Sequence, residues 1–597
     1  MTEKTLETDV FVMGGGLAGC FAAVEAKKSN VDVILADKNY VGKSGCSHFA
    51  RDFMVFNEDW GDDYETWMKQ FTRIGEYIVD HHWVDVILRE SYARYLDLIS
   101  WGFTFYLKDE SIGFPEPGVE PKRILCRPTK YRYTTLIAKY GVRNKMLIAR
   151  KKVKASGCKI LDRIMITDIV KKEGRIVGVV GFDTTNGDYY HIKTKAVVIA
   201  SGGLGFKGAA FGIQFNTGDG LGMGYRAGAA VSSIELGQGM YVVKDCDSIV
   251  INGPVSEIGR KRDMVFNSEG DEFLRGFPHV PTNILWPLEV HHGRGPLFHQ
   301  AYGMNRDDYK AELESYNKTA EGPWIKMLDR AGLDVFTKKF EQFMQLKGNF
   351  YPGGLRVNTD CETNIPGLYA AGDASGTNYT GPNYAALGCG TASACVTGHR
   401  AGQNAAKYAE NIGNIEINTA TSDAKEFVFK PLKRKGGFSP AFILRRLQEI
   451  IFPYEVRIIM HEKRLQAALT MIEFFRDHFL PKQYAADPHE LRLAQEVVSM
   501  LTGAEMMLKG ALFRTESRGW FYREDYPERD DKNWLKWVMI RKEDETMKIW
   551  AEPVPEEFQG DKSLPYEERY PLEYSKLDTK VSLEENEYEY RGERPIF

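Results

Sequence analysis

Residues 10–38 read VFVMGGGLAGCFAAVEAKKSNVDVILADK. An apolar segment, a glycine loop, a run of small residues and a second apolar segment ending in an acid follow one another. Gly14 permits the tight turn out of the first strand, Gly16 lets the backbone approach a pyrophosphate, and Gly19 allows close helix–sheet packing. Asp37 lies 18 residues beyond Gly19, where an acid accepts a hydrogen bond from a ribose hydroxyl. The stretch therefore predicts a βαβ unit that binds a dinucleotide.

The alternative interpretation of this stretch is a glycine-rich turn without a ligand, since such loops are common. A strand, a helix, a second strand and an acid in the correct order make that alternative weaker. Backbone N–H groups at the start of the helix are expected to face the phosphates.

Composition limits the classes of function. The chain has 597 residues, 43% hydrophobic and 27% charged residues, and a net charge of −4. These values predict a globular protein of two to four domains and give no support for binding nucleic acid or an anionic membrane. There is no run of 18 apolar residues, and the N-terminal MTEKTLETD lacks a signal-peptide core. We expect a cytoplasmic protein without direct membrane insertion.

The eight cysteines never form a CxxC pair. They therefore predict neither a ferredoxin-type cluster nor a thioredoxin-type dithiol in this chain. Any iron–sulfur relay would have to come from another subunit.

The remaining segments change character several times. Short strands are expected at 159–171, 176–183 and 189–200, so that the N-terminal sheet closes near residue 200. Residues 240–345 lose the α/β alternation, 350–408 regain it, and the apolar spacing from about 440 onward is helical. Residues 545–597 are acidic and rich in proline, which suggests an extended tail.

Several motifs along the chain resemble one family. They are GGGLAG, IASGG, NTGDG, IPGLYAAGDASG and RTESRGWFYREDYPERDDKNW. Together they resemble the flavoprotein subunits of the succinate dehydrogenase/fumarate reductase superfamily, to which the adenylylsulfate reductase alpha subunits also belong. The resemblance implies an α/β fold: a Rossmann-like FAD-binding domain (1–239 and 346–425), an inserted α+β capping domain (240–345) and a C-terminal helical domain with its tail (426–597).

The resemblance also implies the residues that contact FAD. They are Gly14, Gly16, Leu17, Ala18, Gly19, Asp37, Lys38, Ser44, Gly45, Gly202, Asp219, Asp373 and Gly388. A different interpretation of 216–230, which contains Asp219, is a helix that packs tightly through small residues. The small-residue helix that starts near Gly388 would direct its N-terminus at the flavin C2 carbonyl and stabilise negative charge on the reduced ring.

Membrane-bound members of the family attach FAD through the histidine of an RSHT-like motif. In this chain Gly45, within Lys43-Ser44-Gly45-Cys46, falls at that position. This resembles the adenylylsulfate reductases, so we expect non-covalent FAD. His48, three residues on, is the alternative attachment residue.

The catalytic motifs depart from the family pattern. Residues 256–260, SEIGR, resemble the TEGxRG segment that supplies a proton-donating arginine, and they point to Arg260 with Glu257. A guanidinium acts as an acid only with a substrate anion and a relay that reprotonates it. Lys261-Arg262 replace the usual glycine and acid, so a structural or partner-facing role for Arg260 stays open.

The dicarboxylate clamp of the family is absent. Met240 and Asn349 stand at two histidine positions, and the segment from Asn383 to Gly388 lacks the family's arginine. Each lost charge-assisted hydrogen bond removes about 1.5–3 kcal/mol, which argues against fumarate or succinate as the substrate. The side chains left in these segments suggest a pocket for a neutral or aromatic group, although they could equally pack a domain interface. They are Tyr351, Tyr379, Asn383 and Tyr384, and Tyr384 is the third predicted catalytic residue.

Two histidine pairs, His81-His82 and His291-His292, are not expected to chelate a metal, because adjacent side chains point to different sides. His292 or Arg294 could line a substrate cleft, but solvated or core positions are the more common use of such residues. The basic run 121–135 could bind a phosphate-bearing substrate or simply face solvent.

The sequence thus predicts an FAD-dependent oxidoreductase subunit of anaerobic metabolism. Hydride would pass between flavin N5 and a carbon of a small, non-dicarboxylate substrate, in the reduction of an activated C=C bond or the reverse. Electrons would be exchanged with an iron–sulfur electron-transfer subunit docked near the C-terminal domain. Two alternatives remain: flavin–sulfur chemistry like that of adenylylsulfate reductase, and an electron-transfer subunit without a substrate site.

Overall fold

The computed structural model describes residues 1–125, 136–141, 144–208, 212–243, 249–250, 265–271, 284–285, 287–299, 332, 340–348, 353–413 and 421–570. The predicted residues Glu257, Arg260, Asn349 and Tyr351 lie outside these ranges.

The N-terminal sheet is built around the predicted βαβ unit. Its strands follow the order β8-β2-β1-β11-β10-β9. Their bounds are β8 Lys159–Asp162, β2 Val33–Asp37, β1 Glu3–Met13, β11 Tyr189–Ile199, β10 Arg175–Asp183 and β9 Ile164–Lys172. Strands β8, β2, β1 and β11 are parallel, whereas β10 and β9 continue the sheet antiparallel. Strand β2 is buried throughout, and the end of β1, residues 10–13, is apolar and buried, because both faces of the sheet are covered there.

The sequence suggested that this sheet closes near residue 200, and that prediction is wrong. Strand β19 (Leu368–Ala370) returns from a distant part of the chain and pairs in parallel with the end of β11, from Val197↔Leu368 to Ile199↔Ala370. Antiparallel β10 occupies the same edge only along the first half of β11, which leaves the second half open. The two segments of the predicted FAD-binding domain therefore share one sheet.

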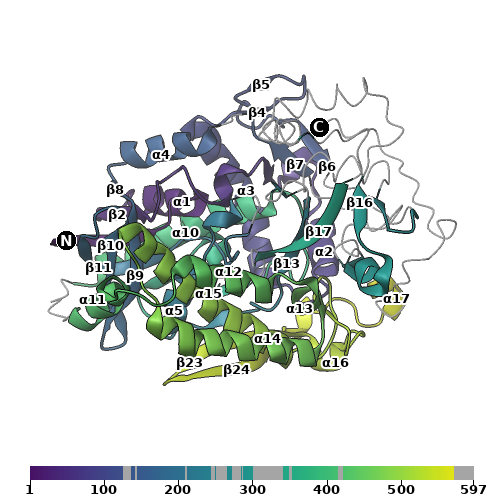
Figure 1. Ribbon diagram of the computed structural model, residues 1–597. Helices are drawn as coiled ribbons and strands as arrows, with labels where there is room; N and C mark the ends of the chain where they lie inside the picture. Colours follow the sequence, from purple (N-terminus) through teal and green to yellow (C-terminus); the bar gives the residue numbers. More distant parts are fainter. Residues whose placement is uncertain are drawn as a thin grey trace.

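Two helices rich in small residues lie side by side next to the sheet, α1 (Leu17–Ala26) and α10 (Cys389–Asn411) (Figure 1). Their backbones approach very closely. A Cβ added at Gly398 would lie 2.3 Å from the carbonyl oxygen of Ala18, and one at Gly402 would lie 2.2 Å from that of Ala22. Glycine at these positions is what allows the two helix backbones to approach so closely.

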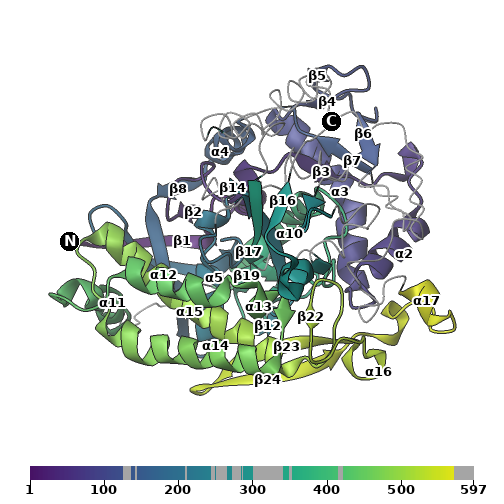
Figure 2. The same cartoon turned by 45° about the vertical axis from the view of Figure 1, so that its right-hand side comes forward.

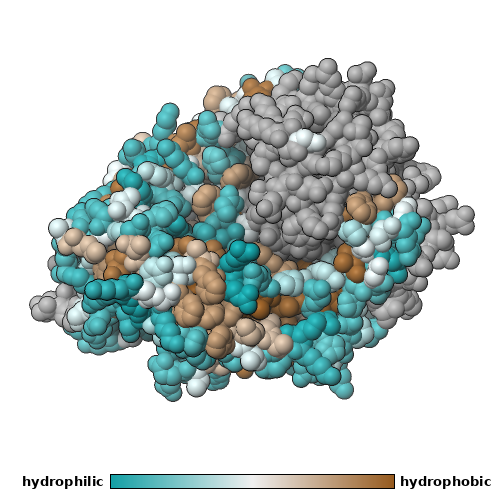
Figure 3. All heavy atoms as spheres, in the orientation of Figure 1, coloured by the Kyte–Doolittle hydropathy of each residue, from teal (hydrophilic) through white to brown (hydrophobic). Residues whose placement is uncertain are grey.

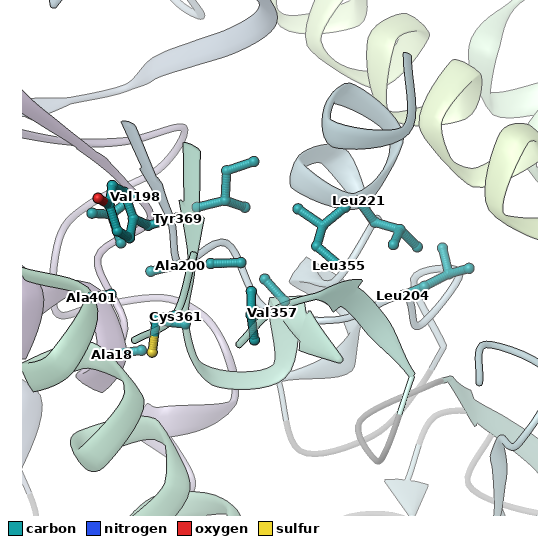
Figure 4. Close-up of a cluster of buried hydrophobic side chains, with 14 of the residues drawn as sticks. Ala18, Val198, Ala200, Leu204, Leu221, Leu355, Val357, Cys361, Tyr369 and Ala401 are labelled. Carbon is teal, nitrogen blue, oxygen red and sulfur yellow. The ribbon is translucent and has the colours of Figure 1, made fainter. Parts of the chain in front are cut away.

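The buried core continues from these helices to the other side of the sheet (Figure 4). Ala18 of α1 lies near Cys361, and Leu221 of α5 (Asp219–Ala227) lies near Leu355 of β18 (Gly354–Arg356). All four side chains are at most 5% exposed.

A second sheet has five strands in the order β20-β18-β12-β23-β24. Its strands are β20 Ser375–Gly376, β18, β12 Val231–Ser232, β23 Lys536–Glu543 and β24 Thr546–Pro553. The prediction of an extended tail from residue 545 is therefore wrong for 546–553, which form a hairpin with β23. The apolar residues of β23 pair with β12 and are buried, so this strand fixes the hairpin to the FAD-binding part.

Within 238–348, the described strands form a separate sheet in the order β14-β13-β17-β16-β15. They are β14 Ile249–Val250, β13 Gln238–Val243, β17 Phe340–Gly348, β16 Leu297–His299 and β15 Val265–Phe266. A helical turn, Val290–Arg294, precedes β16. This sheet lies in the segment that the sequence assigned to the capping domain.

The C-terminal part carries three long helices, α12 (Pro440–Ile451), α14 (Glu462–Phe474) and α15 (Pro488–Phe513), which form one layer (Figure 2). Helices α12 and α15 both begin with proline at the first position and a side-chain cap. Ser439 caps Phe442 N, and Asp487 caps Glu490 N. The helical prediction from residue 440 is confirmed for these segments.

The remaining described elements complete the fold. They are β3 Asp52–Met54, α2 Tyr64–Ile74, α3 His81–Trp101, β4 Phe105–Tyr106, β5 Ile112–Gly113, β6 Arg123–Leu125, β7 Leu136–Lys139, α4 Lys145–Ala155, α11 Ser422–Phe429, α13 Tyr454–Arg457, β21 Ile459–Met460, β22 Tyr522–Arg523, α16 Asp531–Trp534 and α17 Tyr566–Arg569.

A chain of buried ion pairs joins the C-terminal part to the N-terminal part. Glu516 accepts hydrogen bonds from Arg514 Nη1 at 2.8 Å and from Arg518 Nη2 at 2.7 Å, and all three side chains are fully buried. Arg514 also pairs with Glu235 beside β12, at 3.0 Å. Arg529 pairs with Glu76 beyond α2, at 2.8 Å. The RTESRG motif therefore has a structural use as a connector of the two parts.

Candidate functional site

A cavity of about 270 Å³ opens where the βαβ unit meets the start of α10. Most of the predicted site residues lie in its wall. They are Gly14, Gly16, Leu17, Ala18, Asp37, Lys38, Ser44, Gly45, Gly202, Asp219, Asp373, Tyr384 and Gly388. Gly19 does not line the cavity; it packs inside the β1–α1 turn, as its predicted packing role requires.

The β1–α1 loop leaves no room for side chains on the protein side. Gly14 has φ +105°, and a Cβ there would lie 2.4 Å from the carbonyl oxygen of Ala200. A Cβ at Gly15 would lie 2.5 Å from Val41 Cα. The first amide of α1, Leu17 N, donates to Ser47 Oγ at 3.1 Å. The loop thus presents bare backbone and a helix N-terminus to the cavity, which is the arrangement that binds a pyrophosphate.

Asp37 ends β2 in the wall of the same cavity. Its carboxylate accepts Gly15 N at 2.8 Å, Asn39 N at 2.7 Å and Ser44 Oγ at 3.3 Å. Two carboxylate oxygens offer about four acceptor positions, so ribose hydroxyls can still bind. Ser44 therefore acts on the site through the orientation of Asp37.

Lys38 and Asp219 form a buried pair next to Asp37. Lys38 Nζ lies 2.7 Å from Asp219 Oδ2 and 2.8 Å from Glu496 Oε1 of α15. Burial lowers the pKa of Lys38, but the two carboxylates outweigh burial and raise it above its usual value. Asp219 Oδ1 is buried and has no protein partner among the described residues. An unpaired buried carboxylate oxygen is costly, so this atom fits a ligand hydroxyl.

Glu496 is fully buried and contacts three cations, Lys38, Lys207 and Arg492, at 2.8, 3.2 and 2.6 Å. Burial raises the pKa of Glu496, but the cations outweigh burial and bring it from 4.5 to about 2. A carboxylate with a lowered folded-state pKa stabilises the fold above the unfolded value and loses this effect as pH falls toward the folded value.

We expect Glu496→Gln to lower the free energy of unfolding by roughly 3 kcal/mol at neutral pH. The difference from wild type should shrink between pH 4.5 and about 2, the window set by the two pKa values. Denaturant unfolding across this range measures it. Glu449→Gln, in an exposed ion pair with Arg445, is the matched control and should change little. A pH-independent difference for Glu496→Gln would contradict the prediction.

The start of α10 forms the other end of the cavity. Its N-cap, Gly388, has φ +72°, and a Cβ there would lie 2.7 Å from Met54 N. Thr391 Oγ1 donates to the Asp52 carbonyl at 2.7 Å. Gly388 precedes Gly398, which packs on Ala18, by ten residues, or about 15 Å along the helix. The cavity therefore runs from one helix N-terminus, at α1, to another, at α10.

The predicted aromatic pocket is only partly assembled. Tyr384 lines the cavity, together with Leu387 and Trp520. Tyr379 is 2% exposed, and its hydroxyl lies 3.6 Å from Cys389 Sγ. Asn383 Nδ2 donates to the Ile74 carbonyl at 2.5 Å. Tyr379 and Asn383 thus pack between elements, which is the alternative that the sequence had left open for them.

Several wall residues carried no recognisable signal in the sequence. They include Asn39, Ser47, Phe49, Arg51, Asp52, Met165 and Thr391. Cys46, Asn216 and Trp520 also line the cavity; they lie within motifs quoted above but had not been singled out as site residues. Ser47 and Thr391 closely follow glycines, and this could have drawn attention to them. Met165 of β9 and Trp520 reach the cavity only through strand pairing and domain packing.

Other candidates lie outside the cavity wall. His81 bonds to Thr72 at 2.8 Å and stacks on Phe558, while His291 pairs with Glu524 at 3.2 Å. Arg294 pairs with Glu289 at 2.7 Å. Among the described residues, no three His, Cys, Asp or Glu side chains gather in a way that could hold a metal ion. Nor does this described portion contain a helix long and apolar enough to cross a bilayer.

The wall fits FAD in its details. The bare glycine loop and the α1 N-terminus match the pyrophosphate, and Asp37 and the unpartnered Asp219 Oδ1 match hydroxyls. The α10 N-terminus, at the other end of the cavity, matches a ring carbonyl that gains negative charge on reduction. Fold and site together define a flavoprotein.

Comparison with known proteins places this flavoprotein in a family. Residues 9–391 match the family model "FAD binding domain", and residues 445–570 match "Fumarate reductase flavoprotein C-term". The first match alone covers more than half of the chain. The protein belongs to the FAD-binding flavoproteins of the succinate dehydrogenase/fumarate reductase family and is an FAD-dependent oxidoreductase of that type.

Two similar curated proteins span nearly its whole length. One subunit of the fumarate reductase (CoM/CoB) from Methanothermobacter marburgensis is 26% identical, over 91% of this chain and 98% of the relative. The L-aspartate oxidase of Saccharolobus solfataricus is 28% identical, over 88% of this chain and 97% of the relative.

Solved structures share the fold. E. coli quinol fumarate reductase has a TM-score of 0.78 at 20% identity and covers 93% of this chain and 97% of its own. Adenylylsulfate reductase of Archaeoglobus fulgidus has a TM-score of 0.75 at 21% identity, with the same coverage. The predicted α/β architecture with an FAD-binding and a C-terminal domain is thereby confirmed.

Proposed function

We propose that this protein is the FAD-bearing catalytic subunit of a multisubunit oxidoreductase that acts on a carbon of a small substrate without paired carboxylates. Bound FAD supplies hydride exchange at N5. The residues of this chain bind the nucleotide through Gly14, Asp37 and Asp219, and they orient the ring end through α10 and Tyr384. The predicted proton donor Arg260 and its neighbour Glu257 remain part of the proposal, although they lie outside the described residues.

One observation carries the choice of substrate class. The described residues of the cavity wall include two cationic side chains, Lys38 and Arg51, and both are paired with carboxylates. Tyr384, Leu387 and Trp520 contribute an aromatic and apolar surface instead. Arg356, the last residue of β18, pairs with Asp80 at 3.3 Å and stacks on Trp537. This supports an uncharged or singly charged substrate over fumarate, despite the names of several relatives.

The proposed function includes a partner subunit that binds this protein. The relative from Methanothermobacter marburgensis is itself named as one subunit of a larger reductase. Figure 3 shows hydrophobic surface over the C-terminal helices, where Phe442 and Phe474 are each 44% exposed. Exposed aromatic side chains of this kind are enriched in protein interfaces. We assign this surface to contact with an iron–sulfur protein.

The test is carried out without oxygen. The holoprotein is reduced chemically, a candidate oxidant is added, and the flavin absorbance measures the rate of reoxidation. We expect an uncharged α,β-unsaturated ketone to reoxidise the flavin and fumarate to do so at least about a hundredfold more slowly, the loss of two charge-assisted hydrogen bonds. Efficient reoxidation by fumarate would overturn the substrate class. Reoxidation by adenylylsulfate, with release of AMP and sulfite, would identify adenylylsulfate-type chemistry, and reoxidation by an iron–sulfur protein alone would identify an electron-transfer role without a substrate site.

We also propose that FAD is held without a covalent bond. Gly45 stands where family members carry the attaching histidine, and it has φ +77° with no atom within 4 Å of an added Cβ. His48 does not line the cavity. Acid precipitation should therefore release FAD and leave a colourless pellet. A yellow pellet would point to a covalent bond, and Cys46→Ser and His48→Ala would then identify the residue.

A further inference from the structure

Asp52 stands in the cavity wall with one carboxylate oxygen unused. Its side chain is buried and lines the cavity at the start of α10. Oδ2 accepts from Arg51 Nε at 3.0 Å, whereas Oδ1 has no protein partner among the described residues. The free-energy cost of a buried carboxylate oxygen without a hydrogen bond is larger than the net stabilisation that one ordinary hydrogen bond provides. The site is therefore complete only when a ligand donates to Oδ1.

Two cationic side chains lie near Asp52. Arg51 is paired with it, and Lys145 of α4 is close enough for Asp52 to raise its pKa. The effect of burial on the pKa of Lys145 is larger than that of Asp52 and lowers this pKa to about 8. Lys145 Nζ donates to the His48 carbonyl at 3.1 Å. A negative charge at Asp52 offsets part of the cost of burying these two cations.

The position of Asp52 in the cavity indicates which part of FAD would meet it. The Asp52 carbonyl accepts from Thr391 in the first turn of α10, and a Cβ at Gly388 would lie 2.8 Å from the Asp52 carbonyl carbon. This is the end of the cavity far from the α1 N-terminus and Asp37. The pyrimidine edge of a flavin presents two carbonyl acceptors with the N3–H donor between them. Helix N–H groups suit a carbonyl, and a carboxylate oxygen suits N3–H.

We propose that Asp52 Oδ1 accepts the N3–H of the flavin ring and holds a negative charge beside it, which disfavours the anionic reduced flavin. This charge opposes the α10 N-terminus, which stabilises the reduced ring. The proposal rests on FAD binding but not on the substrate class proposed above. Asp52 is thus a cofactor-binding residue that sets both flavin affinity and reduction potential.

The test compares FAD with N3-methyl-FAD, which lacks the N3–H donor, in reconstitution of the full-length apoprotein. Wild type should bind N3-methyl-FAD about 10- to 100-fold more weakly than FAD, the effect of one hydrogen bond to a charged group. Asp52→Ala should weaken FAD binding by a similar factor and bind both flavins within about twofold. Retention of the full preference by Asp52→Ala, or its absence in wild type, overturns the proposal.

Asp52→Asn separates charge from hydrogen bonding, because its amide oxygen can still accept N3–H. It should keep the preference for FAD and shift the flavin midpoint potential to a more positive value; an unchanged potential overturns the electrostatic part. Asp62→Asn is the matched control, since Asp62 is buried and paired with Arg123 at 2.7 Å but does not line the cavity. In this variant the preference for FAD over N3-methyl-FAD and the flavin midpoint potential should both stay as in wild type. They are independent of turnover, so failure of the substrate proposal leaves them interpretable.

Discussion

Replacing Gly19 by alanine should abolish FAD binding and lower the free energy of unfolding by about 3 kcal/mol. Alanine normally stabilises a helix relative to glycine by about 1 kcal/mol. Here the added Cβ would lie 1.8 Å from the Gly14 carbonyl oxygen, which belongs to the cofactor loop itself. Neither the loop nor α1 can move away without opening the β1–α1 turn. Flavin content after purification and denaturant unfolding measure the two effects.

The matched control is Gly222→Ala, in helix α5. Gly222 is also a buried helical glycine, but its added Cβ meets Arg226 and Ser499 only at 3.4 Å, an ordinary contact distance. This variant should bind FAD as wild type does and be equally or more stable. If Gly19→Ala behaved like the control, the role assigned to the β1–α1 turn would be wrong.

Glu516→Ala should destabilise the protein by about 3–5 kcal/mol, because it leaves buried arginines without their carboxylate. Glu516 accepts from Arg514 and from both Nε and Nη2 of Arg518, and it also accepts Asp530 N at 3.0 Å. Each of the three side chains in this cluster is fully buried. Urea denaturation, followed with a fluorophore attached to the C-terminal part, should show that this part detaches first.

Glu449→Ala is the control for this second prediction. Glu449 of α12 pairs with Arg445 at 3.4 Å, and these side chains are 43% and 83% exposed. Exposed ion pairs contribute about 0–1 kcal/mol, so the midpoint of unfolding should barely change. Equal losses for the two variants would show that burial does not determine the strength of the Glu516 cluster.

The nucleotide half of the site could be predicted from local sequence. Gly14 and Gly16 lie in the turn between β1 and α1, and Gly19 lies in the first turn of α1, so their spacing fixes their geometry. Asp37 ends the next strand in register beside β1, so its distance from the loop also follows from the chain. Strands that are close in the sequence have few alternative ways to pair, so this part of the site can be predicted from the sequence.

The ring half could not be predicted in the same way. Asp52 and Trp520 come from segments that have no regular spacing relative to the glycine loop. The pairing of β19 with β11 and of β23 with β12 joins segments far apart in the chain. The number of possible long-range pairings is large, and a single sequence does not distinguish among them.

The sequence alone predicted the family, the cofactor and the residues around its nucleotide half, because these predictions depend on short-range spacing and on backbone conformations that glycine adopts readily. The tertiary structure alone brought Asp52 and Trp520 to the α10 end of the cavity and buried Glu516 between its arginines. Those contacts arise from the packing of helices and sheets that the chain connects only distantly. These side chains at the α10 end of the cavity therefore became visible only in three dimensions.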